Sequence, residues 1–155
     1  MDHSQSHSLI AKLESIFSLT HEERQALSDL PMQVQELRAK HDIVREGDRP
    51  SRCCLLLEGF ACRYKATGDG KRQIMSFHIP GEVPDLQSLH LKTMDHTVQT
   101  ITPCKVGFIT QETMRDLCNR YPRIGSALWR ETLIDGAIFR ESMINIGRRE
   151  AYPRA

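Results

Sequence analysis

Two alternating segments joined by a glycine-rich turn constrain the fold of this chain most strongly. Apolar and polar side chains alternate over residues 60–66 and again over 74–79, with Thr67–Gly70 between them. A period of two places alternate side chains on one face of a strand, and glycine supplies the positive φ that a tight turn needs. The sequence therefore predicts an antiparallel hairpin over residues 60–79. The side chains expected to be buried on one face or the other are Phe60, Cys62, Tyr64, Met75, Phe77 and Ile79.

Short strands surround this hairpin from about residue 33 to 110. Residues 53–57 are apolar on both faces and predict a buried strand, and two further strands are expected near 97–101 and 105–110. Pro80 and Gly81 end the hairpin, and residues 84–89 predict a single helical turn with Asp85 near its start. About seven strands at regular spacing indicate a rolled antiparallel sheet.

Helices are expected at both ends of the chain. Leu9, Leu13 and Phe17 have helical spacing, and Thr20 followed by Glu23 is a capping-box pattern that opens a second short helix. After the strands, a helix over 110–120 is followed by one from Pro122 to about residue 151, roughly 40 Å long. The predicted fold is mainly β: an antiparallel roll with an N-terminal helical cap and a long C-terminal helix.

The long helix is apolar on more than one side. Leu133, Ala137 and Ile144 share one side, whereas Ile134 and Ile138 lie on a neighbouring side. Such a helix needs cover from two directions: the sheet supplies one, and a second copy of the helix or the interior of a monomer supplies the other. We expect a two-fold homodimer, with Glu141 and Arg148 paired across the axis. The expected contacts are Ile134, Ala137, Ile138, Glu141, Ile144 and Arg148.

Charge and composition exclude several classes of protein. Lys and Arg number 21 against 20 Asp and Glu, so there is no basic excess of the kind that a DNA-binding surface needs. Any DNA contact is therefore expected outside these residues. No membrane span or signal peptide is evident, and the five cysteines show no metal-binding spacing. Free cysteines acting as small buried groups fit a reducing cytoplasm.

The order of several short motifs resembles one family. Arg45–Asp48, Leu55–Gly59, Gly68–Lys71 and Pro80–Glu82 follow one another as in the catabolite-activator and fumarate–nitrate-regulator (Crp/Fnr) family. The resemblance covers about residues 10–150. It implies an effector-sensing β-roll over residues 1–121 and a dimerisation helix over 122–155. A DNA-binding helix-turn-helix domain follows in that family, so this chain is expected to be a fragment or a short member.

The resemblance also implies an effector pocket, whose chemistry differs here. Family members that bind cyclic AMP use a glutamate for the ribose and an arginine for the phosphate. Asp85 would replace the glutamate, and Met94 and Asp95 stand where the arginine and its small neighbour belong. Phe139 and Arg140 fall at the helix positions that contact ligand in the family. The candidate pocket residues are Gly81, Glu82, Asp85, Leu86, Gln87, Ser88, Met94, Asp95, His96, Phe139 and Arg140.

An anion beside Asp85 and Asp95 would meet like charge, which Arg140 or His96 would offset only in part. We therefore expect no cyclic AMP in the usual mode and no resident cofactor. A different small effector and a collapsed, empty pocket both remain open.

The histidines and cysteines of the chain raise the question of metal, redox or enzyme chemistry. A metal-binding cupin enzyme would need His78, His90 and His96 to converge, although their spacing lacks the usual HxH pair. A haem or redox sensor would use these histidines with Cys53 or Cys62. No GxSxG string is present and no cysteine precedes Cys53, which argues against a serine hydrolase and an iron–sulfur sensor. We expect a regulator, not an enzyme.

Overall fold

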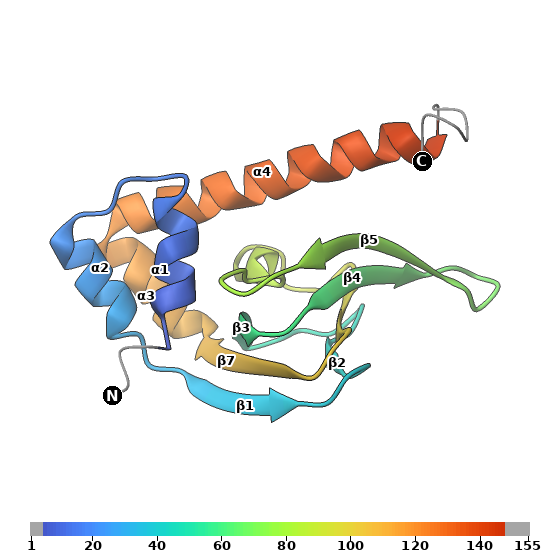
Figure 1. Cartoon of the computed structure of the whole chain (residues 1–155), viewed down its shortest axis with the longest axis horizontal. Coiled ribbons are helices and arrows are strands. Elements are labelled where there is room, and N and C mark those ends of the chain that lie inside the picture. The colour runs from blue at the N-terminus through green and yellow to red at the C-terminus, as the bar shows by residue number, and fades with distance from the viewer. Residues whose placement is uncertain (1–4, 148–155) are drawn as a thin grey trace.

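In the computed structural model of the chain, residues 5–147 are described. Helices gather at one end of the molecule and strands at the other, while the long last helix runs across both (Figure 1). The helices are α1 (His7–Glu14), α2 (His21–Ser28), α3 (Gln111–Arg120) and α4 (Pro122–Gly147). None of the described helices is long and apolar enough to cross a lipid bilayer.

Seven strands within residues 5–147 form two antiparallel sheets. One sheet has the order β1-β7-β3, from β1 (Gln33–Leu37), β7 (Cys104–Thr110) and β3 (Arg52–Glu58). The other has the order β2-β6-β4-β5, from β2 (Asp42–Val44), β6 (Thr97–Thr100), β4 (Ala61–Ala66) and β5 (Arg72–His78). The predicted antiparallel roll with flanking helices is confirmed.

Strand β3 separates two apolar cores. Cys53 and Leu55 pack in the core that the helices share, whereas Cys54 and Leu56 pack inside the roll with Val106 and other strand residues. Because successive side chains point to opposite faces, a strand covered on both sides has a continuous apolar sequence. This confirms the buried strand expected over residues 53–57.

The hairpin forms as predicted, but its expected burial is wrong at three positions. Strands β4 and β5 pair from Ala61–His78 to Ala66–Arg72, and Gly70 has φ +82° in the turn. Phe60, Phe77 and Ile79 are nevertheless 52%, 68% and 49% exposed. Phe60 and Ile79 lie just outside the strands, and Phe77 lies on an edge strand with its side chain in solvent. Alternation in sequence identifies two faces, but only the tertiary packing decides which face is covered.

The predicted local signals at the helix ends are confirmed. Thr20 Oγ1 accepts a hydrogen bond from Glu23 N at 3.2 Å, and Glu23 Oε1 accepts one from Thr20 N at 2.8 Å. This reciprocal capping box begins α2. The single helical turn is the 3₁₀ helix η1 (Leu86–Leu89), with Asp85 at its N-cap.

The fully buried residues of helix α4 lie near its beginning. Ile124, Ala127 and Leu128 are buried, whereas Leu133, Ile138 and Ile146 are 56%, 61% and 62% exposed. The helix continues over β4 and β5 toward the far end of the molecule (Figure 1). The long helix is thus present to Gly147, and the expected contact Arg148 lies outside the described residues.

Candidate functional site

Residues 81 and 82 join the hairpin to β3 and α1. Gly81 N donates to Leu56 O at 2.8 Å, and Leu56 N donates to Glu82 O at 3.0 Å. Gly81 has φ +95°, and a Cβ there would lie 2.5 Å from Ser8 O. Glycine is therefore required at this position both for its conformation and for the close approach of α1.

A small cavity lies between this segment, α1, β4 and α4, and we call it the central cavity. Its volume is about 30 Å³, enough for about one water molecule. Four of the predicted pocket residues line it: Gly81, Glu82, Leu86 and Gln87. The other polar residues in its wall were not among the pocket residues expected from the sequence; they are Lys12, Arg63, His78, Glu131, Thr132 and Asp135.

Glu82 is the centre of a polar network in the wall of the central cavity. Its Oε1 accepts from Ile79 N and lies 3.1 Å from His78 Nδ1, while its Oε2 lies 3.1 Å from Lys12 Nζ. Burial acts to raise the pKa of Glu82, but these hydrogen bonds and charges lower it to about 2. Because Lys12 Nζ also lies 3.6 Å from Glu131, the network joins α1 to α4.

Arg63 makes a second polar connection, from β4 to α4. Its Nε donates to Pro84 O at 2.9 Å, and its Nη1 is paired with Asp135. The side chain is only 13% exposed. One sequence signal could have identified this pair: a cation between the apolar residues Cys62 and Tyr64 of a strand, with Glu131 and Asp135 one helical turn apart on α4.

Asp85 and Ser88 serve mainly to fix η1 against its neighbours. Asp85 is 3% exposed and accepts from Cys54 N at 2.9 Å, and Ser88 Oγ accepts from Gln111 Nε2 at 2.9 Å. Burial raises the pKa of Asp85 to about 7, against the hydrogen bond from Cys54 N. Neither residue lines the central cavity. Asp85 lines a separate polar hollow of about 360 Å³, together with Arg49 and other residues.

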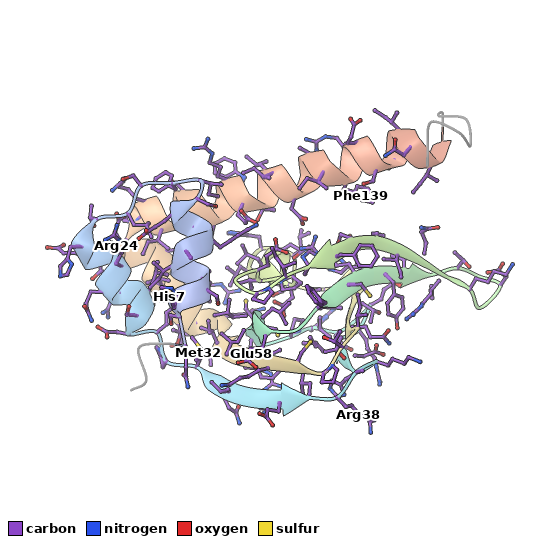
Figure 2. All side chains as sticks on the ribbon, in the orientation of Figure 1. His7, Arg24, Met32, Arg38, Glu58 and Phe139 are labelled. Carbon is purple, nitrogen blue, oxygen red and sulfur yellow. The ribbon has the colours of Figure 1, made fainter. Side chains whose placement is uncertain are left out.

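The remaining predicted residues also lie away from the central cavity. Met94, which the resemblance aligned with the family's phosphate-binding arginine, is 2% exposed in the core of the roll. Asp95 Oδ1 lies 2.7 Å from His96 Nδ1. Phe139, labelled on the outer half of α4 in Figure 2, is 38% exposed, and Arg140 is exposed beside it.

The alternative chemistries find little support in the geometry. No group of three or more His, Cys, Asp or Glu residues within 5–147 is arranged to hold a metal ion, so His78, His90 and His96 do not converge. Burial raises the pKa of the Cys53 thiol to about 12 and raises that of Cys54 as well. A thiol with a raised pKa is a poor nucleophile and a poor redox sensor.

The family is shown by sequence comparison. Residues 34–121 match the family model described as the cyclic nucleotide-binding domain, which covers more than half of the chain. The chain belongs to the cyclic nucleotide-binding domain family, and its sequence is similar to those of the two transcriptional activators described next.

Two curated relatives are similar over 113 residues, or 73% of this chain. They are the transcriptional activator protein FnrA of Stutzerimonas stutzeri, at 26% identity, and the transcriptional activator protein anr of Pseudomonas aeruginosa, at 25%. The chain spans 46% of the length of each relative.

Solved structures show the same fold. FixK2 from Bradyrhizobium japonicum superposes with a TM-score of 0.72 at 22% identity, covering 79% of this chain and 61% of that one. A cyclic nucleotide-binding domain from Methylobacillus flagellatus superposes with a TM-score of 0.73 at 16% identity, covering 90% of this chain and 81% of that one.

Proposed function

We propose that this chain is the effector-sensing and dimerisation module of a Crp/Fnr-like transcription regulator. One observation carries the proposal: helix α4 leaves the body of a cyclic nucleotide-binding domain with its apolar side chains in solvent. Leu133, Ile138 and Ile144 are 56%, 61% and 44% exposed along this stretch. An exposed apolar strip of this length marks an interaction surface.

A second copy of α4 is the partner that fits this strip. Leu133, Ala137, Arg140 and Ile144 follow one another at spacings of four, three and four residues, which is the repeat of two helices packed side by side. Ile134 and Met143 flank this line, both of them exposed. The proposed seam therefore includes Ile134, Ala137, Ile138, Glu141 and Ile144 as expected from the sequence, and adds Leu133 and Met143.

The oligomeric state tests this proposal directly. The chain has a mass of 17.8 kDa, so light scattering at tens of micromolar should give about twice that value. A mass equal to one chain at this concentration would contradict a dimerisation module.

The sensing role is proposed from the central cavity, which lies between the segment that binds ligand in this family and the dimerisation helix. A ligand placed there would contact both, because Glu82 and Gln87 lie on one wall and Glu131 and Asp135 on the other. The effector is proposed to be a small molecule other than cyclic AMP held in the usual mode. Control of DNA is proposed to be exerted through a domain outside these residues.

A further inference from the structure

Arg63 is a cation on the interior face of the roll. In the ladder between β4 and β6 it stands opposite Val98, which is 0% exposed, and across β5 it stands opposite Ser76. A guanidinium keeps its charge at every physiological pH, so it must be paired wherever water is scarce. Here it is paired with Asp135 on α4, its only ion-pair partner within residues 5–147.

The charge of Arg63 also reaches the residues of the ligand-binding segment. Its Nε donates to Pro84 O, one residue before Asp85. Burial lowers the pKa of His96 and the positive charge of Arg63 lowers it further, while the same charge acts against the raised pKa of Asp85. Arg63 is therefore close to the segment from which the family's phosphate-binding arginine is missing.

The small volume of the central cavity limits how a ligand can reach Arg63. At about 30 Å³ it has no room for a carboxylate or phosphate group beside the existing ion pair. The side chain of Asp135 is 29% exposed and can turn into solvent. The side chain of Arg63 is only 13% exposed, and its Nε is also bonded to Pro84 O. An oxyanion that replaced the carboxylate of Asp135 would make the same charge-assisted hydrogen bonds with the guanidinium.

Of the lysine and arginine side chains that line the central cavity, Arg63 is the one that an anion could bind. Lys12 lies between Glu82 and Glu131, and it is engaged by both. The Oε1 atom of Gln87 is buried and has no hydrogen-bond partner among the described residues. Since this acceptor lines the same cavity, it could receive a hydrogen bond from a hydroxyl or amine of the ligand.

We propose that Arg63 is the anion-binding residue of the effector site, and that Asp135 occupies the place of the effector's anionic group. The inference rests on the proposed sensing function and deepens it: the effector is a small oxyanion, a carboxylate or a phosphate, that also carries a hydrogen-bond donor. Its binding separates Asp135 from Arg63 and so breaks the ion pair that joins α4 to strand β4 of the roll. Ligand binding and the position of α4 are coupled through this exchange.

The test removes the internal carboxylate and asks whether an external anion takes its place. In Asp135→Asn the shape is kept and the charge is lost, so inorganic phosphate or acetate should bind at least about tenfold more tightly than to the wild-type chain. Affinity is measured in every variant by isothermal titration calorimetry, and the NMR signal of the Arg63 Nε–H, assigned through its loss in Arg63→Gln, shows whether the anion lies at the guanidinium. Comparing phosphate with acetate shows which oxyanion the site prefers.

Two variants serve as controls. Asp116→Asn removes an exposed carboxylate outside the central cavity, leaves the pair of Arg63 and Asp135 intact, and should bind phosphate as weakly as the wild type. Adding Arg63→Gln to Asp135→Asn should abolish the gained affinity, and Arg63→Met, which also lacks the cation, is used in its place if that double variant does not fold. Equal phosphate affinity in wild type and Asp135→Asn overturns the proposal, as does affinity that survives without the guanidinium. A monomeric wild-type chain would refute the proposed dimerisation function but would leave this result intact.

Discussion

Asp85 is a buried carboxyl group, and its burial disfavours the ionised form. It occupies the N-cap position of η1, its side chain accepts a hydrogen bond from the backbone of β3, and it is 3% exposed. With its pKa raised to about 7 by burial, the folded chain holds a proton here that the unfolded chain releases near pH 4. The folded state therefore loses stability relative to the unfolded state as the pH rises from about 4 to about 7.

We predict that Asp85→Asn removes this pH dependence. Each unit of pKa shift corresponds to about 1.4 kcal/mol, so the variant should gain stability relative to wild type, by up to a few kcal/mol, between pH 4 and pH 8. Urea unfolding at several pH values measures the difference. The exposed Asp116 provides a control, because Asp116→Asn should leave the pH dependence of the wild type unchanged. A constant difference between Asp85→Asn and wild type across this range would contradict the prediction.

A second prediction at this scale concerns Met94 and Asp95. Because Met94 is packed in the core and supplies no cation, a cyclic phosphate loses a charge-assisted contact of about 1.5–3 kcal/mol and meets the carboxylate of Asp95. Cyclic AMP and cyclic GMP should therefore bind at least about a hundredfold more weakly than to a family member that has the arginine. Calorimetry at near-millimolar ligand measures this. Saturable binding at low micromolar concentration would show that another cation, Arg63 or Arg140, replaces it.

At the scale of elements, α4 divides into three parts. Its first turns pack on α3 and on the N-terminal helices, where Ile124 and Ala127 are fully buried. Its middle is held to the body by the ionic contacts of Glu131 and Asp135, and its outer half presents apolar side chains to solvent. Since polar contacts can exchange partners more readily than a close-packed core can rearrange, the middle is the part that a ligand can shift.

We predict that glutamates on the outer half of α4 disrupt the dimer. Replacing Ile134 and Ile138 together with Glu would place four like charges in the seam of two helices, and should yield monomers or insoluble chains. Lys92→Glu adds a negative charge at an exposed position outside α4 and should remain dimeric. Sedimentation equilibrium distinguishes the two. If the double variant stays a soluble dimer, the seam lies on the side of Leu133 and Met143 alone.

At the scale of the whole molecule, the positive and negative charges of the chain nearly balance. The net charge is +1, with acidic and basic residues nearly equal in number. Phosphate contacts dominate DNA affinity, and they require a basic surface. The chain spans 46% of its curated relatives, which are named as transcriptional activators.

We predict that this chain alone does not bind DNA at physiological salt. Fluorescence anisotropy with a short labelled duplex should show no saturable binding up to about 100 µM protein, the weak end of non-specific binding by basic proteins. Binding that weakens steeply with added salt would reveal a basic surface on the chain itself.

The sequence by itself determined the elements and the order in which they occur. The capping box at Thr20, the turn at Gly70, the strand 53–57 and the long helix are local patterns, and each depends only on neighbours in the chain. Tertiary structure alone decided which faces are covered and which charges meet. Phe77 is exposed because it lies on an edge strand, and Arg63 is 72 residues from the carboxylate that neutralises it. Periodicity reports the environment of a side chain within its own element, whereas a cavity depends on how several distant elements are packed together.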